Sequence, residues 1–389
     1  MRLFRNHFVR NASVIVVVVF GVGVALERDA LDSGAIGTPA GTRSAPATQP
    51  ASRPRAVELT LAASGDFLIH SPVWQRAAAN AGGRGYDFAP MFRLIKPYIN
   101  GADLAFCHVE TPLTSRPPKG YPVFNTPRAL ARAIKSTGWD ACDTASNHSL
   151  DLGQYGIDQT SAALQRAGVQ HTGSFRSRAS SRRIVLLKTK GVRVAFLAYT
   201  AVSNGQVLPH RWSVNQASAP KMLRDARRAR SAGADVVIIN VHWGDEYQHQ
   251  PSQAQLRLAR TLTRSAAVTA VIGQHVHVVQ PIRRINGKLV VFGEGNLVSN
   301  QTPACCAPGA QDGIVALLRV RVVPGGSARV TRVDYVPVWV RRPDYVVVPV
   351  WRGRVKGLAP RGELRASWQR TVKVVGRTSR YAPWTKPRP

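Results

Sequence analysis

The chain has 389 residues, of which 44% are hydrophobic and 19% are charged. This length and composition exclude a chain too small or too polar to bury a core, and they fit a globular α/β protein of one large domain or two. The formal charge of +32 at pH 7 predicts attraction to polyanions such as nucleic acid, acidic lipid, teichoic-acid-like polymers or poly-acidic peptides. Charge alone does not choose among these partners, and a genome of high GC content, which raises the arginine content of all its proteins, would produce the same excess.

The N-terminal segment has the pattern of an export signal. Three arginines within the first ten residues precede an apolar run over residues 12–26. The run is shorter than the roughly 20 residues of a typical membrane span, and Gly23 and Ala25 are small residues suited to a cleavage site. Residues 1–27 are therefore expected to be a cleaved signal peptide or an uncleaved signal-anchor. Either one places the rest of the chain outside the cytoplasm, secreted or anchored to the membrane.

Composition divides the remainder of the chain. Residues 28–56 are rich in small residues, proline and arginine without periodicity, which predicts a disordered linker. Residues 57–323 are expected to form the folded domain. Residues 324–389 are expected to add an antiparallel strand and a basic, proline-rich tail, which either covers a sheet edge or is partly disordered.

Strand and helix patterns alternate through most of the chain. Strands are expected over residues 57–64, 103–109, 140–144, 169–173, 235–241, 268–273 and 289–293, and helices over 73–81, 91–99, 126–137, 157–167, 220–232 and 253–266. A hairpin is expected over 183–188 and 193–199, and antiparallel strands over 314–323 and 328–340. Continuous apolar runs such as 103–109 indicate strands buried on both faces, as in a parallel sheet. The expected fold class is layered α/β, either α/β/α or αββα, with a mixed sheet and antiparallel C-terminal strands.

Side chains that bind metals follow five of the predicted strands. They are Asp66, Glu110, the pair Asn147 and His148, His242, and the pair His275 and His277. Because parallel strands end at the same edge of a sheet, these side chains are expected to lie close together. Carboxylate, amide and imidazole groups suit a pair of Mn, Fe or Zn ions, and the lack of thiolates argues against a structural zinc site. The alternative for any single one of them is an ordinary turn, cap or core role.

The four cysteines leave their pairing open. Cys107 and Cys142 lie in apolar, strand-like stretches and could be buried as small hydrophobic residues. Cys305 and Cys306 are adjacent in a loop rich in proline and glycine. A bridge between neighbours is strained, so pairing of one of them elsewhere is an equal alternative.

Six short motifs occur in a distinctive order. They are Gly65-Asp66, Glu110-Thr111-Pro112-Leu113, and the stretches 146–153 (SNHSLDLG), 242–247 (HWGDEY), 273–281 (GQHVHVVQP) and 295–296 (GN). In this combination they resemble the CapA family, the poly-γ-glutamate capsule biosynthesis proteins, whose fold is similar to that of calcineurin-like metallophosphatases. The resemblance covers about residues 57–323.

The resemblance implies a centre of two divalent metal ions. Its ligands would be Asp66, Glu110, Asn147, His242, His275 and His277. Glu110 would stand where metallophosphatases usually have a bridging aspartate. His148 would be the catalytic acid or oxyanion stabiliser, with Asp151 to orient it, and Glu246 would be a catalytic acid or base or would support a ligand. The substrate pocket would be lined by Trp243, Tyr247 and Asn296.

The chain departs from the family pattern at several positions, including the stretch 292–296 (FGEGN), which replaces a Tyr-Ser-Leu-Gly-Asn pattern. His108 stands where an asparagine is usual, and it is either an extra ligand or a core residue. Gln274 replaces the usual histidine before His275. His70 lies four residues after Asp66 rather than two, so it is either a ligand or a residue that supports one.

The resemblance implies a cell-envelope protein that serves the synthesis, export or processing of poly-γ-glutamate or a related anionic capsule polymer, acting as a metal-dependent hydrolase. The alternative is a non-catalytic component that binds or exports the polymer. The expected partners are the polymer and membrane-bound capsule synthesis proteins. No nucleic-acid partner is expected, because no binding motif is present and the chain carries an export pattern.

Overall fold

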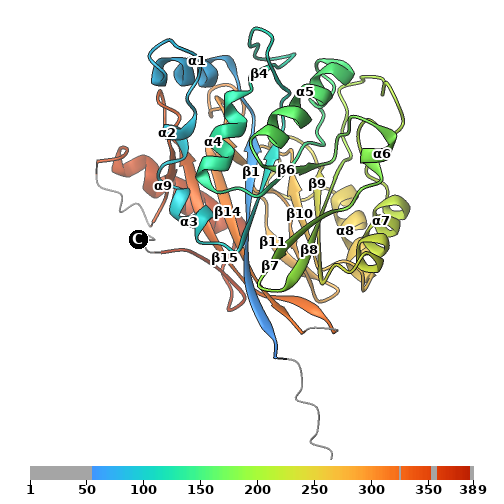
Figure 1. The fold of residues 1–389 in the computed structure, drawn as a ribbon. Helices are drawn as coiled ribbons and strands as arrows, with labels where there is room; N and C mark the ends of the chain where they lie inside the picture. Colours follow the sequence, from blue (N-terminus) through green and yellow to red (C-terminus); the bar gives the residue numbers. More distant parts are fainter. Residues whose placement is uncertain (1–54, 324–325, 352–356, 386–389) are drawn as a thin grey trace, which may run out of the picture. The chain divides into compact units, whose positions relative to one another are not determined.

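The computed structural model describes residues 55–323, 326–351 and 357–385. Within them, two β-sheets pack face to face and helices cover the outer faces (Figure 1). This arrangement is the αββα alternative of the predicted layered α/β fold, which is confirmed. The expected signal segment, residues 1–27, and the linker up to residue 54 lie outside the described residues.

The first sheet is built around β1 (Val57–Phe67), which pairs parallel with β2 on one side and antiparallel with β14 on the other. Its order is β16 (Val347–Pro349), β15 (Ala328–Val340), β14 (Asp312–Val322), β1, β2 (Leu104–Val109), β5 (Ala141–Asp143) and β6 (Gln170–Thr172). In addition, β13 (Asn296–Val298) pairs with β1, and β17 (Tyr381–Pro383) pairs with β15. The sheet is therefore mixed, as predicted, with its parallel half on the side of β2, β5 and β6.

The second sheet has a parallel centre and antiparallel edges. Its order is β11 (Ile282–Ile285), β12 (Lys288–Val291), β10 (Ala270–Gln274), β9 (Val236–His242), β8 (Val192–Thr200) and β7 (Val185–Thr189). The predicted hairpin is the antiparallel pair of β7 and β8. A separate pair of short strands, β3 (Leu113–Thr114) and β4 (Thr126–Pro127), lies beyond β2.

Helices pack on both sides of the paired sheets. The first sheet is covered by α1 (Ser71–Asn80), α2 (Ala89–Phe92), α3 (Lys96–Asn100), α4 (Ala129–Thr137) and α5 (Gly153–Arg166). The second sheet is covered by α7 (Ala219–Ser231) and α8 (Gln253–Arg264). The short α6 (Arg178–Ser181) precedes β7, and α9 (Arg361–Val375) packs against β14 and β15.

Strand alternation divides the hydrophobic residues between the layers. In β1, Leu59 and Leu61 point into the core between the two sheets, whereas Ala62 points toward the helices of the first sheet. In β9, Ile238 faces the same inter-sheet core and Ile239 faces α7 and α8. Because both faces of these strands are buried, their sequences read as continuous apolar runs.

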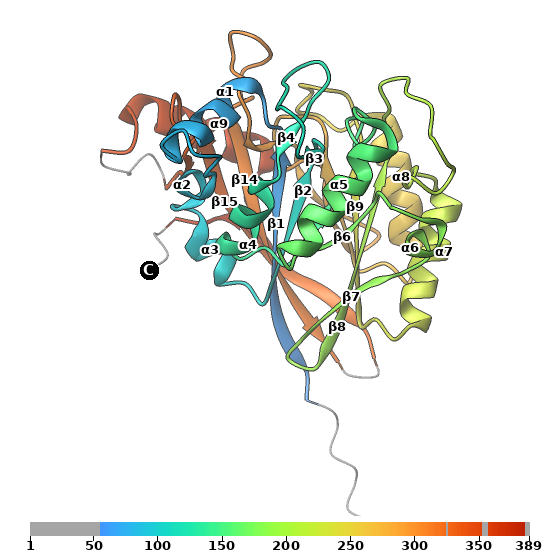
Figure 2. The same ribbon diagram turned by 45° about the horizontal axis from the view of Figure 1, so that its top comes forward.

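The carboxyl ends of the parallel strands in both sheets lie at the same edge, which is turned toward the viewer in Figure 2. The register shows this within each sheet, since Asp66 of β1 pairs with His108 of β2, and His108 pairs with Asp143 of β5. In the second sheet His242 of β9 pairs with Gln274 of β10. The fold thus gathers the strand ends that carry the predicted ligands.

Two predicted helices differ from the structure. The stretch 91–99 forms the two short helices α2 and α3, because Pro97 has no backbone N–H for a continuous helix. In the stretch 126–137 the helix begins only at α4, and Thr126 is not its N-cap. Thr126 belongs to β4 instead, where its N–H donates to the Pro112 carbonyl at 2.8 Å.

The C-terminal region is folded where it is described. β16 extends the first sheet beyond β15, β17 pairs with β15, and α9 packs on β14 and β15. Arg370 of α9 donates to the buried carboxylate of Asp312 at 2.8 Å and 3.1 Å. Of the two alternatives for the tail, the described residues support the one in which it covers part of the sheet.

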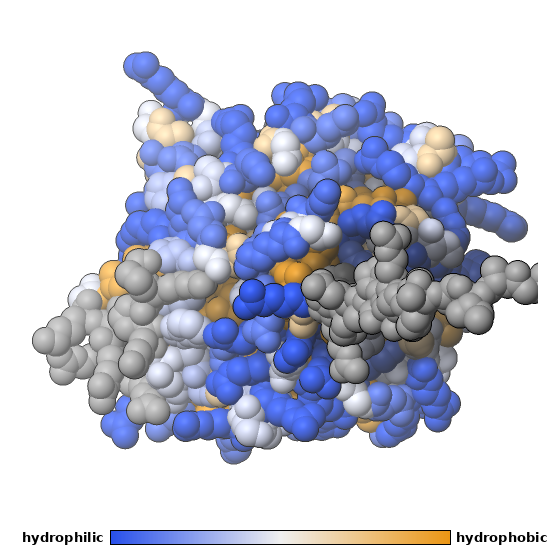
Figure 3. Space-filling view, turned by 60° about the horizontal axis from the view of Figure 1, so that its bottom comes forward, coloured by the Kyte–Doolittle hydropathy of each residue, from blue (hydrophilic) through white to orange (hydrophobic). Residues whose placement is uncertain are grey.

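The cysteines are paired, Cys107 with Cys142 across β2 and β5, and Cys305 with Cys306 in the loop before β14. Among the described residues, none of the helices has the length and hydropathy needed to cross a membrane. Figure 3 views the molecule from the opposite end, where the parallel strands begin. Hydrophilic side chains cover most of that face, and hydrophobic side chains form separate patches.

The variant Trp139→Ala tests the packing of the core between the first sheet and its helices. The fully buried ring of Trp139 meets Phe67 and Phe92 at centroid distances of 5.2 Å and 5.6 Å. Trp139→Ala is expected to lower the free energy of unfolding by about 3–5 kcal/mol, because it leaves a cavity. Val207→Ala, at a side chain 89% exposed, should change it by less than about 0.5 kcal/mol. Urea denaturation measures both, and equal effects would contradict this packing.

Candidate metal centre

Polar side chains from both sheets meet at the edge where the parallel strands end. This edge is turned toward the viewer in Figure 2. They are Asp66 of β1, Glu110 after β2, Asn147 and His148 in the loop after β5, His242 of β9, and His275 and His277 after β10. All of them are buried. The structure therefore brings together every predicted metal ligand, while the roles of these residues stay predictions.

The backbone of this centre has one very close approach between segments, at Gly65, and an unusual conformation at His275 and His277. A Cβ atom on Gly65 would lie 1.9 Å from the Gly295 carbonyl oxygen, so no side chain fits there. The N–H of Asp66 donates to that same carbonyl at 3.0 Å. His275 and His277 have φ angles of 93° and 56°, a conformation that residues with a side chain rarely adopt. Such positions cluster at functional sites, where the surrounding structure holds them in place.

Two sets of ligand side chains share Glu110. One set is Asp66, Glu110 and His277, and the other is Glu110, His242 and His275, with the ligand atoms of each set within 4.8 Å of one another. Glu110 Oε1 lies 3.8 Å from His277 Nε2 and 3.9 Å from His242 Nε2. Asn147 Oδ1 is 2.9 Å from His242 Nε2 and so adjoins the second set. This arrangement could hold two ions with Glu110 between them.

Several buried polar atoms of this centre have no hydrogen-bond partner in the described part of the chain. They are Asp66 Oδ1, both carboxylate oxygens of Glu110, and His275 Nδ1. Burying carboxylate oxygens without a hydrogen bond or counter-ion is strongly unfavourable. Divalent cations would supply the missing partners, and these ligand types are ones that Mn, Fe and Zn ions accept. The residues present therefore fit a divalent metal centre.

Burial and neighbouring charges shift the pKa values of these groups. Burial raises the pKa of Glu110 to about 7. Burial lowers the pKa of His277, but the charges of Glu110 and Asp66 outweigh it and raise this pKa to about 9. Burial, followed by the charge of His277, lowers the pKa of His275 to about 3. At neutral pH a metal-free centre therefore holds a proton on His277 that must leave if a cation binds there.

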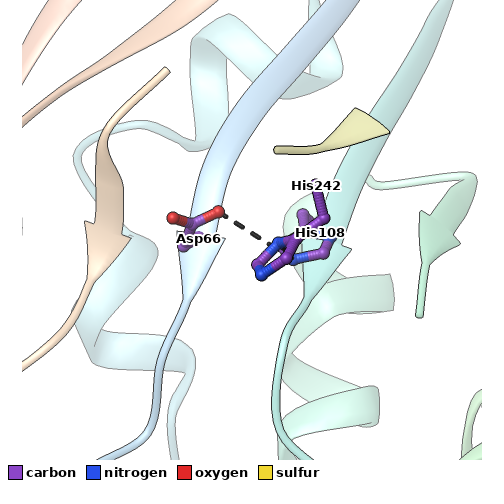
Figure 4. Close-up of side chains that lie close together, drawn as sticks. All are labelled: Asp66, His108 and His242. Atoms are coloured by element: carbon purple, nitrogen blue, oxygen red, sulfur yellow. Dashed lines mark hydrogen bonds and ion pairs between the residues drawn. The ribbon is translucent and has the colours of Figure 1, made fainter. Parts of the chain in front are cut away.

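A row of hydrogen-bonding side chains lies behind His242. His108 Nε2 is 3.0 Å from His242 Nδ1, and the two rings lie beside each other with Asp66 across from them (Figure 4). Asp66 Oδ1 is 3.9 Å from His108 Nε2, so these three side chains could also be a metal set. On its other side, His108 Nδ1 is 3.1 Å from Asp143 Oδ2, which also accepts a hydrogen bond from Asn240 at 2.7 Å.

The contact with Asp143 favours a supporting role for His108 over that of a metal ligand. A carboxylate only accepts, so His108 Nδ1 carries the hydrogen shared with Asp143. Burial lowers the pKa of His108, but the charge and hydrogen bond of Asp143 outweigh it and raise this pKa to about 9. Once the second proton of His108, the one on Nε2, is lost, Nε2 can accept a hydrogen bond from His242 Nδ1, which leaves His242 Nε2 for a metal ion. Sequence reasoning missed Asp143 and Asn240, although Asp143 is a strand-end carboxylate like Asp66.

His148 is held by Asp151, as the sequence predicts. His148 Nδ1 is 2.9 Å from Asp151 Oδ2, which also accepts the Phe124 N–H at 2.7 Å. Burial lowers the pKa of His148, but the hydrogen bond to Asp151 and the charge of Glu110 outweigh it and raise this pKa overall. Because Asp151 takes Nδ1, Nε2 is the ring nitrogen left for a reacting group.

A cavity of about 420 Å³ lies beside the centre. It is lined by Leu68, His70, Tyr121, Phe124, His148, Glu246, Tyr247, His277, Asn300, Gln301, Cys305 and Cys306. Glu246 is exposed at this cavity and could form a further metal set with His275 and His277. Tyr247 accepts a hydrogen bond from Gln301 at 3.0 Å. A larger hollow of about 620 Å³ lies around α6, and none of the predicted ligands lines it.

Trp243 does not lie where the sequence predicts. It is buried in the core between the second sheet and its helices, where its ring stacks on Phe292 and its Nε1 donates to the Phe292 carbonyl at 2.9 Å. The physical reason is strand alternation, since the residue after His242 points to the opposite face of the sheet. The expectation that Trp243 lines the substrate pocket is therefore wrong.

Asn296 and His70 also differ from expectation. Asn296 is fully buried and does not line the cavity. Its Oδ1 lies 3.1 Å from His277 Nδ1, so it orients that ring. His70 lines the cavity, but its Nδ1 lies 3.1 Å from the Leu68 carbonyl, and it belongs to none of the metal sets formed by the described residues.

Residues 60–301 match the family described as Bacterial capsule synthesis protein PGA_cap. The chain belongs to this family. The chain is 28% identical over 255 residues to Capsule biosynthesis protein CapA of Bacillus anthracis, covering 63% of this chain and 60% of that relative. It is 26% identical over 219 residues to PGA biosynthesis protein CapA of Bacillus subtilis, covering 54% and 57%. The matches thus span about three fifths of the length of these relatives, and the predicted CapA-family membership is confirmed.

Similarity to solved structures is weaker. The calcineurin-like phosphoesterase YfkN from Bacillus subtilis is 16% identical with a TM-score of 0.47, over 82% of this chain and 98% of that chain. A 5′-nucleotidase precursor from Thermus thermophilus is 15% identical with a TM-score of 0.46, over 82% and 59%. At these values neither similarity bears on the function of this chain.

Affinity for Mn²⁺ is expected to rise between pH 6 and pH 8. The pKa of His277 is raised to about 9 and that of Glu110 to about 7, so protons compete fully with the metal at pH 6 and less as pH rises. The gain should be about 10-fold per pH unit for each proton displaced. Calorimetry in buffers of different ionisation enthalpy should count more protons released at pH 6 than at pH 8. Equal affinity and proton release at both would contradict these protonation states.

Proposed function

We propose that this chain is a metal-dependent hydrolase of the cell envelope that acts on poly-γ-glutamate or a related anionic capsule polymer. The observation that supports it most is the set of unpartnered, buried oxygens of Asp66 and Glu110 next to a cavity lined by His148. The names of the related proteins support the polymer class, and the formal charge of +32 suits an anionic substrate. The charged and then apolar pattern of residues 1–27 supports a location outside the cytoplasm.

The residues would hold two divalent ions. One set of ligands is Asp66, Glu110 and His277, and the other is Glu110, His242, His275 and Asn147. Bound there, such ions supply Lewis-acid chemistry that polarises the bond to be cleaved and makes water more acidic. Glu110 belongs to both sets, so its carboxylate would help to hold both ions.

His148 is the group that would move a proton. Its Nδ1 is bound to Asp151, which raises its pKa against the effect of burial, so its Nε2 can donate a proton to the leaving nitrogen or oxygen. Phe124 packs edge-on against the His148 ring at a centroid distance of 4.7 Å and restricts its rotation. Glu246 and Tyr247 line the same cavity and would contact the substrate.

Glu110→Gln tests the hydrolase. It keeps the shape of the side chain but removes the charge shared by both metal sets, so the metal content should fall and hydrolysis should drop by more than about 100-fold. Elemental analysis and a γ-glutamyl polymer cleavage assay measure these effects. Glu58→Gln removes one exposed charge from β1 and should change neither. A protein that binds two ions but cleaves neither γ-glutamyl polymers nor phosphoesters would contradict the hydrolase and favour a non-catalytic polymer-binding component.

Asp151→Asn tests the role of His148. Asp151 raises the pKa of His148, so its loss should lower that pKa. If His148 acts as an acid, activity falls as pH rises through its pKa, and the alkaline limb of the pH–rate profile should move to lower pH. The matched variant Asp158→Asn, on α5, should leave the limb in place. An unmoved limb in Asp151→Asn would show that His148 is not the acid.

A further inference from the structure

Two neighbouring hollows lie on the outer face of α4 and α5, which run side by side in front of the first sheet in Figure 1. One, of about 410 Å³, lies between the start of α4 and residues 115–118. The other, of about 290 Å³, lies between α4 and α5. Both are lined by Arg128 and Arg132, so they adjoin, and they are also lined by Arg116 and Arg166 respectively. We name the surface formed by these four residues the arginine groove.

The positive charge of the arginine groove is not neutralised by the described residues. No carboxylate lines either hollow, and none of the ion pairs in the described part of the chain uses one of the four arginines. Elsewhere arginines do have acidic neighbours, as Arg228 has Asp225 and Arg370 has Asp312. Four exposed guanidinium groups around one groove repel each other and favour an anionic ligand.

One guanidinium of the groove is held in place. Arg116 lies over the ring of Tyr155 with 4.0 Å between its Cζ and the ring centroid, a cation–π contact. The hydrogen bond of Ser115, together with the charges of Arg116 and Arg128, lowers the pKa of Tyr155. An ordered guanidinium loses less conformational entropy when it binds a carboxylate.

The segment that forms one wall of the groove also forms a wall of the cavity lined by His148, which we name the catalytic cavity. Residues 115–118 line the groove, whereas Tyr121 and Phe124 of the same β3–β4 connection line the cavity. The connection is braced by paired backbone hydrogen bonds between Lys119 and Asn125 at 2.9 Å and 3.0 Å. The Asn125 side chain also donates to the Arg116 carbonyl at 2.9 Å. A single ordered segment therefore has the groove on one side and the cavity on the other.

We propose that the arginine groove binds one stretch of a polycarboxylate polymer while another bond of the same polymer molecule lies in the catalytic cavity. The identity of the polymer rests on the proposed function. Guanidinium groups bind carboxylates through two parallel hydrogen bonds, which suits a polymer with a carboxylate on each repeat. Single-stranded nucleic acid instead binds by stacking successive bases on several aromatic faces, whereas among the residues that the structure describes Tyr86 is the one aromatic residue that lines the two hollows and the Tyr155 face is covered by Arg116.

The test compares two triple variants of the full chain that lose the same charge. The groove variant is Arg116→Gln, Arg128→Gln and Arg132→Gln. The matched control, on α7 and α8, is Arg224→Gln, Arg227→Gln and Arg257→Gln, all exposed. Fluorescence anisotropy with labelled poly-γ-glutamate measures Kd at several salt concentrations. The groove variant should bind more than about 10-fold more weakly, since a charge-assisted hydrogen bond can contribute that much, and it should show a shallower salt dependence. The control should change by less than about threefold.

Glu110→Gln separates this proposal from the hydrolase. It should lower hydrolysis by more than about 100-fold, and adding the three groove substitutions to it should still weaken polymer binding by more than about 10-fold, because Glu110 lies outside the groove. If the polymer is never cleaved but the groove variant alone loses affinity, the groove proposal stands and the hydrolase fails. Equal weakening in both triple variants, or no weakening in the groove variant at an unchanged unfolding temperature, would overturn the groove proposal. Tighter binding of single-stranded DNA than of poly-γ-glutamate, lost in the groove variant, would overturn the choice of ligand.

Discussion

The burial of two carboxylates at the ends of β1 and β2 is the constraint on which this centre depends. Asp66 and Glu110 are 0% and 1% exposed, and three of their four side-chain oxygens have no hydrogen-bond partner among the described residues. An unpartnered carboxylate is disfavoured in a buried position, which is why burial raises the pKa of Glu110 to about 7. The same burial strengthens the attraction of the site for cations, because little water screens the charge.

The site forms where the two sheets face each other. Along each strand, the side chains that point between the sheets are apolar at first and become polar at the carboxyl end. In β2, Phe106 stacks on Phe196 of the second sheet at 4.5 Å, and His108, two residues later on the same face, contacts His242. In β9, Ile238 faces the inter-sheet core, and Asn240 on the same face donates to Asp143. The candidate metal centre is thus the polar end of the core between the sheets, and its geometry depends on how tightly the sheets pack.

The alternation of strands and helices predicted the layered fold. The polar residues that directly follow the strands predicted which side chains gather at the edge, because parallel strands end on the same side of a sheet. This reasoning failed for Trp243, since a strand sends neighbouring side chains to opposite faces and only His242 faces the centre. It also missed Asp143, whose role depends on a contact with His108 across two strands. The helix α9 was missed because its sequence is interrupted by polar residues, and its position depends on packing against β14 and β15.

Anomalous diffraction from crystals grown with Mn²⁺ tests the central claim most directly. Two anomalous peaks are expected, one on each side of the Glu110 carboxylate. The first should lie among Asp66, Glu110 and His277, and the second among Glu110, His242 and His275. A protein that binds Mn²⁺ in solution but shows its anomalous peaks away from Glu110, or none at this edge of the sheets, would contradict the account.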